Sequence, residues 1–273
     1  MLFGIIGGDR RQEVLLDLLR KDGYPVAAYG VAGEADWENA VTAEVVILPL
    51  PLCREGDTLN MEGEQRGVGA LFHRLRRDQL ILAGQVKPAQ RTEALELDLN
   101  LIDYFKREEL TVANAAEGTV QVILEYLERS LLGSQCLILG YGRIGKLVSC
   151  RLAALGAQTT IAARRPESRA WAEAYGHKAL DIGHLKGELN HFDVVVNTVP
   201  APVFGEMHLR ELKPGCLCVD VASVRGIDLP AAENLGLPNV WARALPGKLM
   251  PETAGKIIRD TVYTIIKEQG VTL

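Results

Sequence analysis

The first hundred residues alternate between short apolar runs and segments with helical spacing. Residues 2–6 and 25–29 are strand-length apolar runs, and the spacing predicts an amphipathic helix over about 10–21 between them. Apolar runs within 43–51 and 77–86 predict two more strands. Short buried strands separated by helical segments are typical of a mainly parallel sheet with both faces covered.

The second half of the chain repeats the strand, glycine turn and helix with which the first half opens. Residues 135–139 predict a strand, a helical pattern continues to Leu155, and a second strand follows at 158–162. Apolar runs within 191–202 and 213–226 predict further strands. The repeated pattern predicts two related mononucleotide-binding folds.

These patterns predict an α/β fold with two doubly wound domains, an N-terminal flavodoxin- or Rossmann-like domain and a C-terminal NAD(P)-binding Rossmann domain. A length of 273 residues also favours two domains over one. We expect an N-terminal α/β domain on the substrate side at 1–113, an interdomain helix at 114–132, an NADP-binding Rossmann domain at 133–250 and a C-terminal helix at 251–273. The leucine-rich face of the 114–132 helix could instead be an oligomer surface.

Composition narrows the class of partner. The net charge is −5 without a long basic block, which makes nucleic acid and anionic membrane poor candidates. No apolar run is long enough to span a bilayer, and no secretory signal is recognisable, so we expect a cytoplasmic protein.

The cysteines and histidines carry no readable metal site or disulfide framework. Five cysteines are an odd number, and no C-x-x-C pair occurs, which favours reduced thiols. Cys216 and Cys218 alternate within an apolar run and should be small buried residues of a strand. The five histidines show no ligand spacing, so no metal is expected.

A dinucleotide fingerprint follows the strand at 135–139. Gly140, Gly142 and Gly145 form G-x-G-x-x-G between that strand and the next helix. The first glycine allows a tight turn, the second lets backbone N–H groups approach the pyrophosphate, and the third allows close helix packing. The predicted cofactor-binding residues at this turn are Gly140, Tyr141, Gly142, Arg143, Ile144 and Gly145.

The residues after the second strand of this unit predict which dinucleotide is preferred. An NAD site usually has an acidic residue there, but this chain has Ala163 followed by Arg164 and Arg165, with Ser168 nearby. Two guanidinium groups without a carboxylate favour the 2′-phosphate of NADP. Either arginine, Arg165 more than Arg164, could instead be a solvated residue at the start of the next helix.

Polar residues at later strand ends are candidates for the cofactor and substrate cleft. We expect Thr198, Val199 and Pro200 to contact the cofactor. Near the C-terminus, Lys248 precedes a predicted helix start at Thr253, Ala254 and Gly255, an arrangement suited to binding a carboxylate, although Lys248 could equally be an exposed loop cation.

Several motifs together indicate a family. The segments GIIGGDRRQ, AEG at 116–118, LGYGRIGK, AARR, NTVPAP, VDVAS and RALPGK..P.TAG resemble the A subunit of dipicolinate synthase over nearly the whole chain. The resemblance implies a sporulation enzyme of the mother-cell cytosol that works with the B subunit of dipicolinate synthase. It further implies NADP-linked oxidation of the cyclic dicarboxylate made by dihydrodipicolinate synthase. We also expect this chain to form a homo-oligomer within the larger hetero-oligomer.

The chemistry of that substrate suggests site residues, because two carboxylates must be held while a ring C–H faces the nicotinamide. Candidate carboxylate-binding residues are Arg10, Lys87, Lys248, Thr253, Ala254 and Gly255. Candidate catalytic residues are Lys248, Thr253 and three polar groups expected near the nicotinamide, Asn197, Asp220 and Ser223. No residue is readable as the proton acceptor.

Two other functions remain open from the sequence. The chain could be an NADP-dependent dehydrogenase of another small carboxylate, such as a 2-hydroxyacid, for which His208 with Glu211 is a loose candidate pair. It could also be a noncatalytic NADP-binding subunit.

Overall fold

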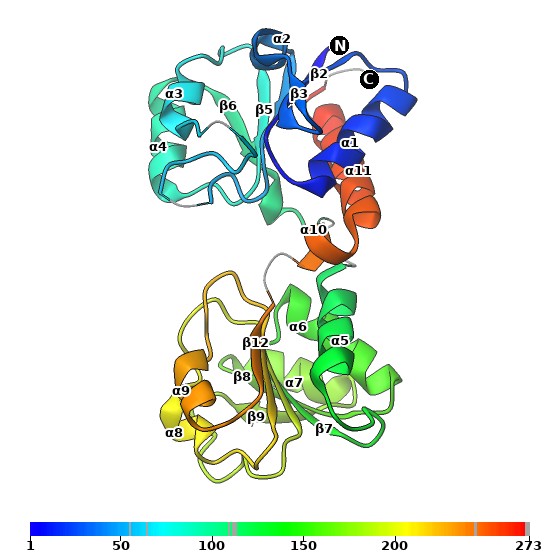
Figure 1. Ribbon diagram of the computed structural model, residues 1–273, viewed down its shortest axis with the longest axis vertical. Helices are drawn as coiled ribbons and strands as arrows, with labels where there is room; N and C mark the ends of the chain where they lie inside the picture. The colour runs from blue at the N-terminus through cyan, green and yellow to red at the C-terminus, as the bar shows by residue number, and fades with distance from the viewer. Residues whose placement is uncertain (55, 64, 109, 111–113, 243–244, 271–273) are drawn as a thin grey trace. The chain divides into compact units, whose positions relative to one another are not determined.

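A computed structural model describes the whole chain except residues 55, 64, 109, 111–113, 243–244 and 271–273. The chain divides into two compact units, one made of Met1–Thr111 with Gly247–Leu273 and the other of Val112–Pro246 (Figure 1). Each unit is built around its own six-stranded sheet.

The first unit has a sheet with the strand order β3-β2-β1-β4-β5-β6. Its strands are β1 (Phe3–Ile6), β2 (Val26–Val31), β3 (Glu34–Ala35), β4 (Val45–Ile47), β5 (Leu80–Ala83) and β6 (Asn100–Asp103). The two-residue β3 pairs antiparallel with β2, and the other strands pair in parallel. Without β3 the order, counted along the chain, is 2-1-3-4-5, which is that of flavodoxin-like folds.

Helices cover both faces of this sheet. They are α1 (Arg10–Lys21), α2 (Trp37–Thr42), α3 (Val68–Phe72), α4 (Pro88–Glu96), the 3₁₀ turn Tyr104–Lys106 and α11 (Pro251–Glu268). Successive residues of β4 alternate between two cores, Val45 and Ile47 with the residues of α1 and α11, Val46 with those of α2 and α3. The C-terminal helix α11 packs against α1 in Figure 1, and both contribute to one core.

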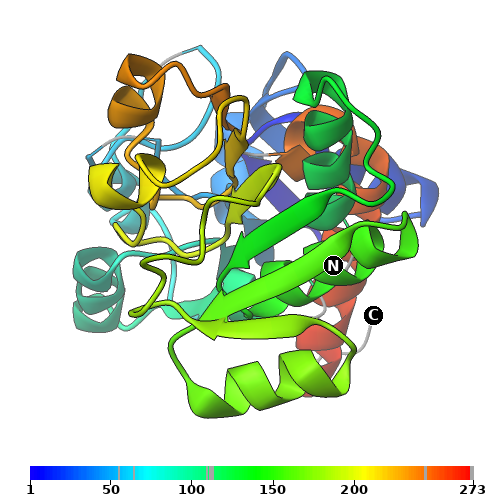
Figure 2. The ribbon, with the colours of Figure 1, turned by 90° about the horizontal axis from the view of Figure 1, so that it is seen from below.

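The second unit has an all-parallel sheet with the order β12-β11-β10-β7-β8-β9 (Figure 2). Its strands are β7 (Gln135–Leu139), β8 (Gln158–Ala163), β9 (Lys178–Asp181), β10 (Val194–Asn197), β11 (Leu217–Asp220) and β12 (Asn239–Trp241). Counted along the chain, the order is 6-5-4-1-2-3, the Rossmann arrangement. The predicted fold class, two doubly wound α/β domains, is confirmed.

The helices of this unit are α5 (Asn114–Tyr126), α6 (Arg143–Ala154), α7 (Pro166–Ala174), α8 (Glu206–Leu209) and α9 (Leu229–Asn234). A further short helix, α10 (Leu245–Leu249), crosses the boundary between the two units along the chain. Residues of α5 and α6 share one core with the strands, and Cys216 and Cys218 are completely buried in the other, as expected from their alternation.

The elements differ from the sequence-based expectation mainly in length. The helix expected to run to residue 132 ends at Tyr126, and Leu124 and Leu132 are exposed, so only part of the apolar spacing faces a core. The strands predicted at 135–139 and 158–162 are found with these bounds or one residue more, but some apolar runs are longer than their strands: the run 191–202 contains β10 of four residues only. Buried loops adjoining a strand are apolar as well, so hydrophobicity alone does not mark strand ends.

Candidate functional site

The glycine turn after β7 has the geometry that the fingerprint predicts. Gly140 has a φ of +92°, and a Cβ there would lie 2.7 Å from the Thr198 hydroxyl oxygen and from a Val199 methyl carbon. A Cβ at Gly145 would lie 2.3 Å from the carbonyl oxygen of Gly140. The turn and the start of α6 therefore pack against β7 and the loop after β10 at distances that only glycine permits.

Gly142 is different, because a Cβ there would meet no atom within 4 Å. It is the N-cap residue of α6, with an extended backbone and no side-chain hydrogen bond to the helix. The first N–H groups of a helix have no partner within the helix and favour negative charge. Open space and uncapped amides at one point fit a dinucleotide pyrophosphate.

The other predicted residues of the turn surround this point. Tyr141 is buried, and the Lys146 ammonium lies 5.9 Å from the centre of its ring. Ile144 is partly buried against the core, whereas the side chain of Arg143 is exposed.

The end of β8 carries cations and no carboxylate. Ala163 is buried, and the exposed Arg164 and Arg165 follow it, with half-exposed Ser168 in the first turn of α7. Within the described part of the chain, neither the Arg164 nor the Arg165 guanidinium has a hydrogen-bond acceptor or ion-pair partner. Arg169 holds the backbone here by donating to the carbonyl oxygens of Ala163 and Arg164, both at 2.9 Å.

Asn197 and Asp220 lie opposite each other at the ends of β10 and β11, and both are completely buried. The Asn197 amide nitrogen donates to Asp220 Oδ1 at 3.0 Å. Asp220 also accepts from the backbone N–H groups of Ala222, Gly226 and Ile227 at 2.7–3.0 Å. Such fully bonded, buried groups fix the two loops, so the structure supports a positioning role for both residues, in contrast to the catalytic contact that we expected.

The remaining predicted residues of these loops are more accessible. The Thr198 hydroxyl donates to the Leu139 carbonyl oxygen at 2.9 Å and faces Gly140. Val199 is half-buried, and Pro200 and Ser223 are exposed. Arg225, also exposed, lies over the Trp241 ring at 4.7 Å from its centre.

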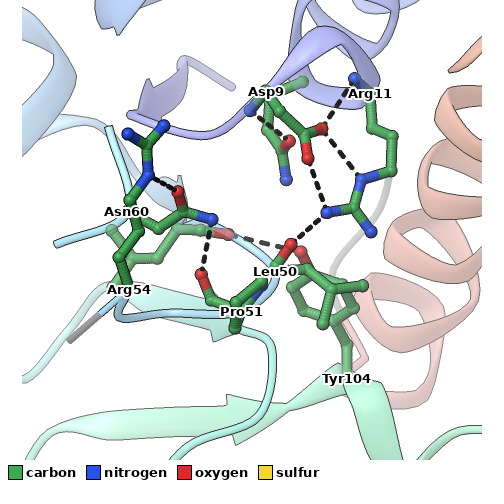
Figure 3. Close-up of polar contacts among 9 residues, drawn as sticks. Asp9, Arg11, Leu50, Pro51, Arg54, Asn60 and Tyr104 are labelled. Carbon is green, nitrogen blue, oxygen red and sulfur yellow. Dashed lines mark hydrogen bonds and ion pairs between the residues drawn. The ribbon is translucent and has the colours of Figure 1, made fainter. Parts of the chain in front are cut away.

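A second polar cluster follows β1 in the first unit (Figure 3). Asp9 is the N-cap residue of α1 and forms a capping box with Gln12. Its carboxylate accepts from the Arg11 Nε at 2.8 Å and Nη2 at 2.7 Å, and Nη2 also donates to the Leu50 carbonyl oxygen. Burial raises the pKa of the Asp9 carboxyl, but the hydrogen bonds and charge of Arg11, with the charge of Arg54, hold that pKa below its ordinary value.

The predicted carboxylate-binding residues of the first unit do not gather into one cluster of contacts. Arg10 is exposed and has no partner among the described residues. The Lys87 ammonium donates to the Gly56 carbonyl oxygen at 2.7 Å. Lys248 and Thr253 are exposed.

Gly255 and Ala254 are used for packing, which corrects their assignment as substrate-binding residues. Both are buried, and a Cβ at Gly255 would lie 2.6 Å from a Val14 methyl carbon and 2.9 Å from the Arg11 carbonyl oxygen. This glycine allows α11 to approach α1 closely. Arg243 and Ala244 of the RALPGK segment lie outside the described residues.

The same segment nevertheless meets the Asp9 cluster. A Cβ at Gly247 would lie 2.8 Å from Asp9 Oδ2 and 3.1 Å from Arg11 Nε, so its backbone packs directly on the ion pair. Two distant motifs of the chain, GGDRR and PGK, therefore come together in the first unit. The sequence contained both motifs but no signal for their contact.

The described residues contain no candidate metal site and no candidate membrane-spanning helix. They contain no group of three or more His, Cys, Asp or Glu side chains that could hold a metal ion. No helix among them has the length and apolar character needed to cross a membrane.

Comparison with family models assigns both parts of the chain. Residues 2–105 match the N-terminal domain of the dipicolinate synthase A subunit. Residues 100–231 match the NAD binding domain of D-isomer specific 2-hydroxyacid dehydrogenases. The second unit is thus a Rossmann domain of oxidoreductase type for a nicotinamide dinucleotide.

Individual proteins similar to this chain include A subunits of dipicolinate synthase, in agreement with the family models. The dipicolinate synthase A subunit of Bacillus subtilis is 26% identical over 268 residues, covering 90% of this chain and 89% of that protein. A glutamyl-tRNA reductase of Chloroflexus aggregans is 30% identical but covers 50% of this chain and 34% of its own. The crystal structure of the dipicolinate synthase A subunit from Bacillus halodurans has a TM-score of 0.85 at 24% identity, with 97% of each chain covered. An Escherichia coli D-lactate dehydrogenase shares the fold at a TM-score of 0.68 and 16% identity, with 100% and 98% covered.

Proposed function

Because nine tenths of this chain matches the A subunit of dipicolinate synthase, we propose that it oxidises the cyclic product of dihydrodipicolinate synthase to dipicolinate. The observation that carries the proposal is the union, in one chain, of the N-terminal domain of that enzyme with a dehydrogenase-type Rossmann domain. The proposed setting is the mother-cell cytosol during sporulation. The proposed partners are the B subunit of dipicolinate synthase and further copies of this chain.

The proposed cofactor is NADP, which when bound supplies the hydride acceptor. The uncapped start of α6 at Gly142 would hold its pyrophosphate. Arg164 and Arg165 would bind the 2′-phosphate, because both are exposed, cationic and without an acceptor in the described structure. A charge-assisted hydrogen bond contributes about 1.5–3 kcal/mol, which corresponds to a roughly ten- to hundred-fold preference for NADP over NAD.

Other side chains of the second unit would shape the nicotinamide end of the site. Asn197 and Asp220 hold the loops after β10 and β11 in place, and Thr198 closes the glycine turn. The exposed Ser223 and Arg225 of the second loop would face a carboxylate substrate, Arg225 with its guanidinium over the Trp241 ring. Formation of an aromatic pyridine makes the oxidation favourable, so cationic binding groups matter more than a strong base.

A coupled absorbance assay tests the function. The purified chain is mixed with NADP and the freshly made product of dihydrodipicolinate synthase, with and without the partner B subunit, and NADPH and dipicolinate are followed together. We expect the two products to appear in equal amounts. Formation of neither product, whether or not the partner is present, would contradict the proposal, and NADPH formation with a 2-hydroxyacid alone would favour a different dehydrogenase.

A further inference from the structure

Arg54 is a cation of the first unit whose orientation is set by buried groups. It lies in the loop after β4, and its Nε donates to Asn60 Oδ1 at 2.6 Å (Figure 3). Asn60 is only 6% exposed. The Asn60 amide nitrogen donates to the Pro51 carbonyl oxygen at 3.1 Å, and its backbone carbonyl accepts from the Gly8 N–H at 2.7 Å. Asn60 thus connects Arg54 to the turns that follow both β1 and β4.

The outer end of this guanidinium is available to a ligand. Arg54 is exposed, and its two terminal nitrogen atoms point away from Asn60 in Figure 3. In the part of the chain that the structure describes, these two nitrogens have no acceptor. A planar guanidinium with its Nε already engaged still presents a pair of terminal nitrogens, the arrangement that binds a carboxylate through two parallel hydrogen bonds.

Three neighbouring cations of the same unit already have partners, whereas Arg10, exposed at the start of α1, has none among the described residues. Arg11 is bound to Asp9 and the Leu50 carbonyl oxygen, and Arg66 stacks over Trp37 at 4.2 Å from its ring centre. Lys87 donates to Gly56. Arg54 therefore differs from them in being held at one end and open at the other.

The position of Arg54 also fits a ligand site. The carboxyl ends of β1 and β4 are neighbours in a parallel sheet, and ligands of doubly wound folds bind at this edge, where the strand order reverses. The first unit reverses its order between β1 and β4, since β2 lies on one side of β1 and β4 on the other. Figure 3 also shows Arg54 in the same group of polar residues as Asp9 and Arg11, on which the backbone of Gly247 packs.

We propose that Arg54 binds one carboxylate of a planar cyclic dicarboxylate, and that Asn60 is the positioning residue that orients its guanidinium. The inference rests on the proposed function, because it names the residue that recognises the substrate class. The sequence-based candidates did not include either residue.

Calorimetric titration of the full chain, loaded with NADPH, tests the role of Arg54. The probes are dipicolinate and pyridine-2-carboxylate, which lacks the second carboxylate. The wild-type protein should bind dipicolinate more tightly than pyridine-2-carboxylate. Arg54→Gln should weaken dipicolinate binding about ten- to hundred-fold and remove the difference between the two ligands, while NADPH affinity stays unchanged.

Two variants accompany this one. Arg54→Lys keeps the charge but not the paired nitrogens, so it should lose part of the affinity. Arg77→Gln, at an exposed arginine paired with Asp98, is the control and should change neither affinity. A thermal melt of each variant establishes that it is folded.

The positioning role of Asn60 is tested by measuring dipicolinate binding with and without Arg54. Asn60→Ala should weaken dipicolinate binding in the wild-type background but have no further effect when Arg54 is already glutamine, because the two residues act through one contact. Equal losses in both backgrounds would mean that Asn60 acts through the fold alone.

The outcomes separate this inference from the proposed function. If the wild-type chain binds dipicolinate and Arg54→Gln binds it equally well, the role of Arg54 is wrong and the function stands. If the wild-type chain binds NADPH but neither pyridine carboxylate, the proposed substrate class is wrong and the inference fails with it.

Discussion

The two units begin with the same local pattern, a buried strand, a glycine turn and a helix, but the two helix starts are occupied differently. In the second unit, α6 begins after Gly142 without a side-chain cap and with open space beside it. In the first unit, the Asp9 carboxylate caps α1 and is itself bound by Arg11. One helix start is open to an anion, and the other already holds one from its own chain.

This difference predicts that the two similar turns recognise ligands in different ways. A helix N-terminus stabilises negative charge, and in α1 that charge belongs to Asp9. We therefore expect side chains around the turn to recognise a ligand of the first unit, and among them Arg54 combines unused donors with an orientation set by Asn60. In the second unit the backbone itself is available for recognition.

Removing the Asp9 carboxylate at the start of α1 should have a large effect on the free energy of unfolding. Asp9→Ala leaves Arg11, only 7% exposed, without its ionic partner, and we expect a loss of about 3–5 kcal/mol in the free energy of unfolding. Urea denaturation measures it. Asp228→Ala is the matched control, because Asp228 caps α9 through one hydrogen bond to Ala231 and should cost about 1 kcal/mol. Similar losses for the two variants would mean that the Asp9–Arg11 pair adds nothing to capping.

Adding a methyl group at Gly142, in the open turn of the second unit, should weaken NADPH binding without lowering the stability of the fold. Gly142→Ala introduces a Cβ into open space at a φ of −83°, so the fold should tolerate it, but the Cβ occupies room that the pyrophosphate needs. We expect NADPH binding to weaken by about 3 kcal/mol, roughly hundred-fold. Fluorescence titration with NADPH measures it.

Gly205→Ala provides the control for this substitution. Gly205 is also the N-cap residue of a helix, α8, with a φ of −93° and no atom within 4 Å of the added Cβ. Its NADPH affinity should equal that of the wild type. A Gly142→Ala protein that binds NADPH normally would show that the open turn is not the pyrophosphate site.

The cations at the end of β8 should determine which dinucleotide is preferred. Replacing Arg164 and Arg165 together by glutamine should reduce NADPH affinity roughly ten- to hundred-fold and leave NADH affinity unchanged, since only NADPH carries the 2′-phosphate. Arg210→Gln, which breaks an exposed ion pair with Glu206 on α8, is the control for loss of charge. An equal loss of affinity for NADPH and NADH would mean that the two arginines do not recognise the 2′-phosphate.

A smaller effect is expected in the pH dependence of the free energy of unfolding. The pKa of the Asp9 carboxyl is lowered from its ordinary value of 3.8, so its contribution to stability is complete above that pH and is lost as the pH falls through the lower folded-state pKa. Asp9→Asn keeps a good capping residue but cannot titrate, so its stability should fall less steeply below about pH 4 than that of the wild type. If the stability of both proteins fell equally steeply with pH, Asp9 would not be one of the groups that make the protein less stable in acid.

The sequence placed the residues of the second unit's predicted site more easily than those of the first, because the former follow local signals. The fingerprint glycines and Arg164 follow their strands directly, so a strand–turn–helix pattern locates them without long-range contacts. At Asn197 and Asp220 the strand ends were recognised, but burial was not. Their mutual hydrogen bond depends on the pairing of β10 with β11.

The site that we propose in the first unit depends on long-range contacts that no local sequence pattern predicts. Arg54 lies in a polar loop without periodicity, and its orientation depends on Asn60 and, through it, on Gly8. Arg10 looked suitable because of its charge, but Arg11 is the residue that turns inward. Gly255 was assigned to a ligand because it lies near a helix start, whereas it packs against Val14 of α1, at the other end of the sequence.

We propose that a 2′-phosphorylated dinucleotide binds at the open turn of the second unit, beside Arg164 and Arg165. Isothermal titration of the purified chain with NADPH and with NADH, at one salt concentration, measures this preference. We predict that NADPH binds roughly ten- to hundred-fold more tightly than NADH. Equal affinity for the two, or binding of neither, would contradict it.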